Sequence, residues 1–222
     1  MNMNQDISQA IETKMRAAGV AGATIDAFLA AVAKVAAGER GQISEAMIAP
    51  VAELPSLESL PAAGGGAAEL LNQLAVIKLN GGLGTSMGLE RAKSLIRVKG
   101  EDTFLDFIAK QILHLRARSG APKLAFYLMD SFSTQADTLA YLKKYPSLAV
   151  DGELDFLQSK VPKLDAKTLL PVSWPAAPDL EWCPPGHGDI YTALLTSGML
   201  EQMLSAGYRY AFVSNGDNLG AT

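Results

Sequence analysis

The sequence has little of several features that would place it in other classes of protein. It has one cysteine, Cys183, among 222 residues, so no internal disulfide can form. Its formal net charge is -4 at pH 7, which disfavours binding to a nucleic-acid backbone by phosphate neutralisation. Its longest apolar stretch, residues 27–37, contains Lys34 and is too short to span a bilayer. Residues 1–6 lack the basic and apolar regions of a secretory signal, so we expect a cytoplasmic protein without a nucleic-acid or membrane partner.

Residues 1–66 are predicted to form a helical N-terminal segment followed by a linker. Ile7, Ile11 and Met15 recur at four-residue steps, and a second apolar helix face follows Thr24, which we expect to be a helix cap. Prolines and a run of glycines then interrupt regular structure, at Pro50, Pro55, Pro61 and residues 64–66.

Residues 67–222 are predicted to form the nucleotide-binding part of an α/β domain. Apolar runs indicate strands at 74–79, 94–98, 123–129, 154–157 and 208–214. Between them we expect a helix capped by Thr103, a helix ending near 145, a proline-punctuated excursion at 162–185 and a helix at 189–205. Buried strands joined by helical crossovers imply a mostly parallel, Rossmann-like sheet with helices on both faces and ligands beyond the carboxyl ends of the strands.

Residues 79–88, with Lys93 and Ser94, carry the strongest functional signal. Four glycines follow an apolar strand, where their backbone N–H groups can turn toward an anion, and a lysine follows them. The spacing fits neither the dinucleotide-binding pattern nor the Walker loop, because Met87 occupies the third glycine position of the former and Ala92 precedes Lys93. The pattern favours a nucleoside triphosphate lying across a strand end. A glycine-rich turn with a surface lysine is the alternative.

Two further loops carry candidate residues. In residues 182–189, prolines and glycines flank His187, and Asp189 can cap the next helix, so the imidazole is placed to donate to an anion. The alternative is a core histidine. In residues 215–218, Asp217 follows a strand and is our candidate Mg²⁺ ligand, although the same residues also fit a simple turn. Because parallel strands end at the same edge of a sheet, we expect these loops and residues 130–131 to lie together at that edge.

The chain resembles the UTP–glucose-1-phosphate uridylyltransferases of eukaryotic type, and the resemblance covers about residues 70–222. Four motifs match in order and spacing: residues 78–88, 93–96, 184–189 and 215–221. The Leu-Asn-Gly-Gly form of the first loop favours glucose over N-acetylglucosamine. The family usually has proline where this chain has Ala92, and an aromatic residue where it has Cys183. Family members continue beyond Thr222, so the resemblance implies that the C-terminal part of the fold is absent.

The resemblance implies a role for each matching position. Leu79, Asn80, Gly81, Gly82, Lys93, Gln158, Gly186 and Asp217 would bind the nucleotide, with Gln158 reading the uracil edge. Gly81, Gly82, His187, Asn215, Gly216 and Asp217 would bind the sugar phosphate. Lys93 and Asp217 would be catalytic, and Asp217 would hold Mg²⁺ near the α-phosphate.

The implied reaction converts UTP and glucose 1-phosphate into UDP-glucose and pyrophosphate by Mg²⁺-assisted in-line attack on the α-phosphate. Catalysis would depend on positioning and charge neutralisation, and no general base is required. Two alternatives stay open: a non-catalytic truncated fragment that at most binds UTP, and a pyrophosphorylase for another sugar 1-phosphate.

Overall fold

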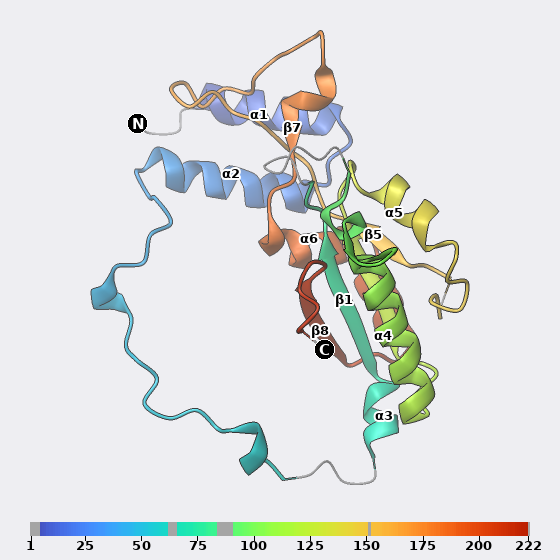
Figure 1. Cartoon of the computed structure of the whole chain (residues 1–222). Coiled ribbons are helices and arrows are strands. Elements are labelled where there is room, and N and C mark those ends of the chain that lie inside the picture. Colours follow the sequence, from blue (N-terminus) through green and yellow to red (C-terminus); the bar gives the residue numbers. More distant parts are fainter. Residues whose placement is uncertain (1–4, 62–65, 84–90, 151, 222) are drawn as a thin grey trace. The chain divides into compact units, whose positions relative to one another are not determined.

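The computed structural model describes residues 5–61, 66–83, 91–150 and 152–221. The chain, traced in Figure 1, divides into two compact units, each of which has most of its residue contacts within itself. Unit 1 combines residues 1–66 with 162–181, and unit 2 combines residues 67–161 with 182–222. The predicted boundary between functional domains, after residue 66, stays a prediction.

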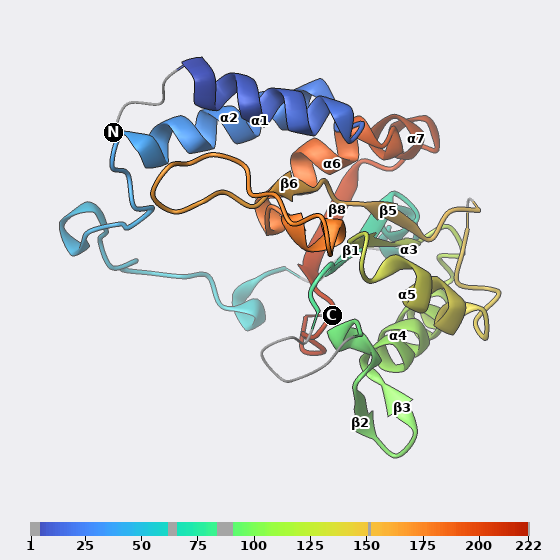
Figure 2. The same cartoon turned by 90° about the horizontal axis from the view of Figure 1, so that it is seen from above.

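Unit 1 contains two helices that pack side by side, α1 (Gln5–Ala17) and α2 (Gly22–Ala36) (Figure 2). Ile7, Ile11 and Met15 are buried on one face of α1, as their four-residue spacing predicts. Thr24 is not the cap of α2. The helix begins at Gly22, and the Thr24 N–H already donates to the Ala21 carbonyl, so Thr24 lies inside the first turn and is buried.

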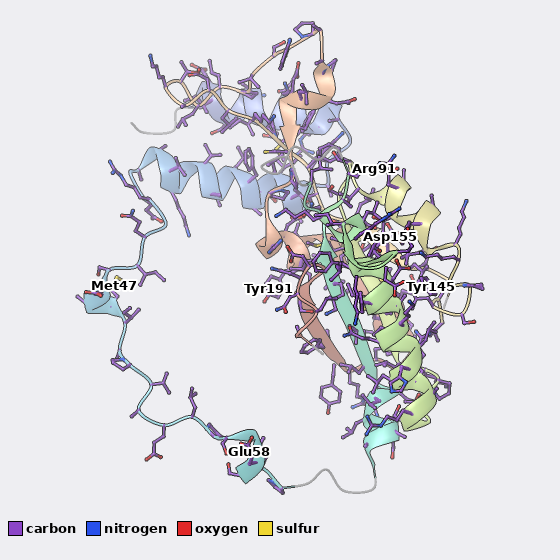
Figure 3. All side chains as sticks on the ribbon, viewed as in Figure 1. Met47, Glu58, Arg91, Tyr145, Asp155 and Tyr191 are labelled. Atoms are coloured by element: carbon purple, nitrogen blue, oxygen red, sulfur yellow. The ribbon has the colours of Figure 1, made fainter. Side chains whose placement is uncertain are left out.

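The remainder of unit 1 has little regular structure. Residues 37–61 contain two short 3-10 helices, η1 (Glu45–Met47) and η2 (Leu57–Ser59). The excursion at 162–181 ends in η5 (Pro178–Glu181) and is tied to α1, because the Lys14 ammonium donates to the Val172 carbonyl and to the Glu181 carboxylate. Exposed apolar side chains follow one another along 37–61, among them Ile43, Met47 (labelled in Figure 3), Ile48, Val51 and Leu54.

Unit 2 is built on a four-stranded parallel sheet with the order β5-β4-β1-β8. Its strands are β1 (Leu74–Asn80), β4 (Ala125–Asp130), β5 (Asp155–Leu157) and β8 (Tyr210–Asn215), and the short helix α3 (Ala67–Leu71) precedes β1. All six residues of β4 are buried, whereas most of β8 is exposed. The predicted parallel sheet is therefore confirmed.

Helices cover both faces of this sheet, because alternate residues of a strand point to opposite sides. Ile77 and Tyr127 share one core with helices α6 (Ile190–Thr196) and α7 (Met199–Ser205). Val76 and Phe126 belong to the other core, with helices α4 (Phe104–Ser119) and α5 (Gln135–Leu142). Figure 2 shows the two helix pairs on opposite sides of the strands. The helical layers predicted on both faces are confirmed.

Two predicted elements differ from the structure. The helix expected over 189–205 is divided into α6 and α7, because Gly198 adopts a left-handed conformation with φ 78° between them. The strand expected over 94–98 is instead a 3-10 turn, η4 (Lys93–Leu95), followed by β2 (Arg97–Lys99), which pairs with β3 (Asp102–Thr103). The remaining short elements are β6 (Val161–Pro162), β7 (Trp182–Cys183) and η6 (His187–Asp189).

The start of α4 is held by a buried carboxylate. Thr103 caps the helix, as predicted, in a capping box with Asp106. The Asp106 carboxylate also accepts hydrogen bonds from the hydroxyls of Tyr141 at 2.6 Å and Tyr145 at 2.7 Å, and pairs with Lys144 at 2.6 Å (Figure 3 labels Tyr145). Burial alone would raise the pKa of Asp106, but these donors outweigh it and hold the pKa well below its usual range. The interaction joins α4 to the end of α5.

No helix in the parts of the chain that the structure describes has both the length and the apolar character that a membrane crossing requires.

We predict that Asp106→Ala lowers the free energy of unfolding at pH 7 by about 2–4 kcal/mol, because it leaves the buried Thr103 N–H and the half-buried hydroxyls of Tyr141 and Tyr145 without an acceptor. Because the pKa of Asp106 is lowered on folding, its stabilising effect is complete above the unfolded-state pKa of about 4 and is lost as the pH falls below that value. The difference in the free energy of unfolding between wild type and variant should therefore become smaller in acid. Urea unfolding followed by circular dichroism at several pH values measures it.

Asp102→Ala is the matched control, because Asp102 makes only a partly exposed ion pair with Lys110. It should cost less than about 1 kcal/mol. Equal losses for the two variants would contradict the role given to Asp106.

Candidate functional site

A polar pocket lies at the carboxyl ends of β1 and β8 in unit 2. Strands β1, β4 and β8 run parallel, so their following loops emerge at one edge of the sheet, where ligands bind in open α/β sheets. The pocket has a volume of about 150 Å³. Its lining comes from four loops that are distant in sequence: Leu79, Asn80, Gly82, Lys93, Ser94, His187, Asn215, Gly216 and Asp217.

The loop after β1 and the turn that carries Lys93 lie together. The Lys93 N–H donates to the Gly82 carbonyl at 3.2 Å, and Leu83 forms an isolated bridge with Ala92. Residues 82–83 and 92–93 therefore run side by side, and Lys93 returns to the beginning of the glycine loop. The rest of the glycine motif, residues 84–88, lies outside the described residues.

The Asn80 side chain forms hydrogen bonds within the protein, whereas a contact with the ligand was expected. Its side chain is buried, and its amide nitrogen donates to Asp130 Oδ1 at 2.6 Å and to Thr138 Oγ1 at 3.0 Å. Its amide oxygen accepts a hydrogen bond from the Ser94 hydroxyl. The side chain of Asn80 thus joins β1, β4, α5 and the Lys93 turn, and its predicted contact with a nucleotide stays a prediction.

Gln158 lies directly against Gly81. A Cβ atom built on Gly81 would lie 2.1 Å from Gln158 Nε2, so only glycine fits here while Gln158 keeps its position. Gln158 follows the edge strand β5 and is anchored by its own N–H, which donates to the Asp130 carbonyl at 2.8 Å. Neither Gly81 nor Gln158 lines the pocket itself, but Gly81 separates two residues that do.

His187 lines the pocket from the loop before α6, whereas Gly186 precedes it without lining the pocket. Gly186 adopts φ 107°, a conformation that favours glycine, immediately before the η6 turn. Asp189 makes no capping hydrogen bond to α6, contrary to expectation, because its carboxylate accepts the Ser159 N–H at 2.6 Å. Burial raises the pKa of Asp189. This hydrogen bond ties the His187 loop to the segment that contains Gln158.

Asn215, Gly216 and Asp217 extend β8 past the end of the sheet. The Gly216 N–H donates to the Leu79 carbonyl at 2.9 Å, and a Cβ at this position would lie 3.1 Å from the same oxygen, so glycine permits the close approach. Asp217 brings a carboxylate to the pocket. Among the described residues, no group of three His, Cys, Asp or Glu side chains could hold a metal ion. This donor set fits Mg²⁺ only if phosphate oxygens and water complete the coordination, which is the usual pattern for that ion.

Ser94 and Asp130 lie near the site but were not among the predicted site residues, and the hydrogen bond from the Ser159 N–H to the Asp189 carboxylate was not predicted either. Asp130 is fully buried, and burial, with a smaller contribution from Asp155, raises the pKa of Asp130 to about 7. Its Oδ2 atom has no hydrogen-bond partner among the described residues. The sequence indicates that Asp130 lies at a strand end, but it does not indicate that Asn80 is its hydrogen-bond partner.

A parallel sheet with a glycine-bordered polar pocket at the carboxyl ends of its strands defines the class of α/β nucleotide-binding proteins. A sequence profile for UTP–glucose-1-phosphate uridylyltransferase matches residues 25–222. The chain belongs to this family of enzymes.

Two curated relatives carry the same name. The protein from Solanum tuberosum is 41% identical over 179 residues, which are 80% of this chain and 36% of the relative. The protein from Encephalitozoon cuniculi is 46% identical over 154 residues, which are 69% of this chain and 30% of the relative. The matched part of the chain therefore spans about a third of the length of these relatives.

Solved structures agree in fold. UDP-glucose pyrophosphorylase from Leishmania major, an S374W mutant in complex with UDP-glucose, matches with a TM-score of 0.91 and 48% identity over 99% of this chain and 46% of that one. UDP-glucose phosphorylase from Trypanosoma brucei matches with a TM-score of 0.89 and 47% identity, over 98% of this chain and 47% of that one. The expected α/β fold, corresponding to about half of these chains, is confirmed.

We predict that Gly81→Ala destabilises the protein by about 1–3 kcal/mol, because the added methyl group overlaps the Gln158 amide. Gly82→Ala is the matched control, since a Cβ there meets nothing within 4 Å, and it should change stability by less than about 0.5 kcal/mol. Urea unfolding of both variants measures the difference.

Combining Gly81→Ala with Gln158→Ala tests the cause. If the clash with Gln158 is responsible, the Gly81 substitution should cost less than half as much in the Gln158→Ala background. An unchanged cost would assign the effect to the backbone of Gly81 alone.

Proposed function

We propose that this chain carries the nucleotide-binding part of a nucleotidyltransferase that forms UDP-glucose and pyrophosphate from UTP and glucose 1-phosphate. The observation that carries the proposal is the pocket at the strand ends, where Lys93, His187 and Asp217 meet beside the exposed backbone of Gly82. Two positive or hydrogen-bond-donating side chains and one carboxylate suit a substrate that has several phosphate groups and a cation. The UDP-glucose complex of the L. major neighbour supports the same ligand class.

The proposed roles are those that the family resemblance implies for each matching position. The backbone of residues 79–82 runs along uridine and its phosphates, with Gly81 and Gly82 also facing the sugar phosphate. Lys93, at the other end of the same loop, neutralises the negative charge of the triphosphate. Gln158 reads the uracil edge; its side chain lies against Gly81, and its backbone N–H is anchored on the Asp130 carbonyl.

The sugar-phosphate side of the pocket is assigned to the other two loops. His187 donates to the phosphate of glucose 1-phosphate, and Gly186 supports the nucleotide from the preceding turn. Asn215 and Gly216 line the sugar pocket, where the short Gly216 contact to Leu79 keeps β8 close to β1. Asp217 holds Mg²⁺, which supplies charge neutralisation at the phosphates when it is bound.

The chemistry required of the protein is positioning and charge stabilisation. A phosphate oxygen of glucose 1-phosphate attacks the α-phosphorus of UTP, the bond from that phosphorus to the bridging oxygen breaks, and pyrophosphate leaves. The attacking phosphate is already ionised at pH 7, so no side chain has to remove a proton. Lys93, His187 and the loop N–H groups lower the barrier by holding two anions in line and by stabilising charge. A cytoplasmic location remains part of the proposal.

A second candidate function is nucleotide binding without turnover. In the described residues β8 pairs only with β1, and its apolar side chains are exposed, with Tyr210 at 56% and Val213 at 42%. An exposed apolar edge strand is a template for pairing with a further strand, and a sheet that lacks this strand supports binding more readily than it supports a complete catalytic site. Measuring UDP-glucose and pyrophosphate formation separates the two, and a panel of sugar 1-phosphates tests the identity of the sugar.

We predict that the chain binds UTP in the presence of Mg²⁺, and that Lys93→Ala weakens this binding at least about tenfold because a charge-assisted contact to the triphosphate is lost. Asp217→Ala should weaken binding only when Mg²⁺ is present. Isothermal titration calorimetry with and without Mg²⁺ measures both effects.

Lys99→Ala is the control, because it removes an exposed lysine of β2 that does not line the pocket. It should leave UTP binding unchanged. A folded chain that binds no UTP, or Lys93 and Asp217 variants that bind as tightly as wild type, would refute the proposed function.

A further inference from the structure

A cluster of buried polar side chains lies next to the pocket in unit 2. Its members are Asn80 at the end of β1, Ser94 in the η4 turn, Asp130 at the end of β4 and Thr138 in α5, and each is at most 4% exposed. Asn80 and Ser94 line the pocket, whereas Asp130 and Thr138 do not. The cluster therefore connects the pocket to residues that a ligand in the pocket does not touch.

The hydrogen bonds of this cluster have a defined direction. The Asn80 amide donates both of its hydrogens, one to Asp130 Oδ1 at 2.6 Å and one to Thr138 Oγ1 at 3.0 Å. Its oxygen is then the only part of the amide left to accept the Ser94 hydroxyl. A reversed amide would direct N–H groups at Ser94 and an oxygen at Asp130, so the acceptor at Asp130 decides which way Asn80 faces.

The position of Ser94 in turn fixes the backbone of the adjacent Lys93. Lys93 and Ser94 belong to the same 3-10 turn, which is closed by the Leu95 N–H donating to the Ala92 carbonyl at 3.0 Å and the Ile96 N–H donating to the Lys93 carbonyl at 3.0 Å. The backbone of Lys93 is fixed on one side by Gly82, and the turn is fixed on the other side by the buried Ser94 hydroxyl. The long Lys93 side chain starts from this turn, so a displaced turn moves the ammonium group.

We propose that Asp130 is a positioning residue that holds the Lys93 turn at the pocket through Asn80 and Ser94. Its importance for catalysis rests on the function proposed above, but the positioning itself is a property of the chain alone. Asp130 does not line the pocket, so its side chain reaches Lys93 through Asn80 and Ser94, and its carboxylate also accepts the Thr134 hydroxyl at 3.3 Å beside the start of α5.

The chemistry of Asp130 suggests a conservative variant. Burial raises the pKa of Asp130, so the carboxyl group gives up its charge more readily than an exposed one, and a neutral acceptor oxygen is enough for Asn80. Asp130→Asn keeps an acceptor oxygen for Asn80, whereas its N–H groups replace Oδ2, which has no partner among the described residues, so some loss of stability is expected without loss of the acceptor. Asp130→Ala removes the acceptor altogether.

We expect hydrogen exchange of the intact chain, followed by mass spectrometry, to reveal the connection. Asp130→Ala should increase exchange of residues 93–96 at least tenfold, because the amides of Leu95 and Ile96 close the turn and the Lys93 amide joins the turn to the Gly82 carbonyl, while Asp130→Asn stays closer to wild type. Asp155→Ala is the matched control, since Asp155 is a buried carboxylate on the next strand that bonds to Gln135 instead. It should not change exchange at 93–96.

Ser94→Ala breaks the connection at its other end and keeps the experiment decisive if Asp130→Ala does not fold. It should also increase exchange at 93–96 at least tenfold while leaving the Asn80 to Asp130 hydrogen bond in place. Unchanged exchange at 93–96 in a folded Asp130→Ala or Ser94→Ala variant would overturn the proposal, and so would Asp130→Asn exchanging as fast as Asp130→Ala.

UTP binding then separates this proposal from the proposed function. Asp130→Ala should weaken binding of UTP with Mg²⁺ about tenfold in the wild-type background and have no further effect when Lys93 is alanine. A wild-type chain without UTP affinity refutes the proposed function and leaves the exchange result to decide the role of Asp130. Additive effects of the Asp130 and Lys93 substitutions would show that Asp130 does not act through Lys93.

Discussion

The parallel pairing of β1 with β4 on one side and β8 on the other is the constraint on which the site depends. Asn80 is paired with Asp130 in the register of the sheet, and Leu79 with Asn215, so the last residues of three strands are brought together by backbone hydrogen bonds. A register shift of one residue would turn every side chain of β1 to the opposite face and would separate Asn80 from Asp130. The cores on both faces oppose such a shift, because each holds alternate residues of β1 and β4.

Much of unit 2 could be predicted from the sequence because its signals are local. The apolar runs at 74–79 and 123–129, the Thr103 cap and the glycines after β1 each identify an element within a few residues, and the order of elements implies a parallel sheet. Other features depend on contacts between distant segments. The grouping of 162–181 with residues 1–66 follows from such contacts, whereas the division of the 189–205 helix at Gly198 and the position of Thr24 inside its helix are local details that the pattern of apolar residues did not indicate.

The site shows the same division. Strand ends, glycines and the isolated His187 and Asp217 were sufficient to expect the loops that line the pocket, because loops after parallel strands emerge at one edge. The orientation of individual side chains could not be predicted from these local signals. Asn80 and Asp189 both have short polar side chains that suit a ligand or a helix cap, and only the folded chain offers them Asp130 and the Ser159 N–H as partners.

The excursion at 162–181 has a consequence for how the polypeptide acquires its structure. Unit 1 is discontinuous, and the Lys14 ammonium reaches a carbonyl that lies 158 positions later in the chain. Helices α1 and α2 therefore emerge from the ribosome long before the segment that completes their unit, and strands β1, β4 and β5 are synthesised in between. Closing so long a loop is slow, and unit 2 in turn needs β8, which is synthesised after the excursion and pairs with β1, so both units depend on long-range contacts made late in synthesis. A shortened gene that omits the first two helices would leave the excursion without Lys14 and would expose a loop to proteases instead of producing a smaller intact domain.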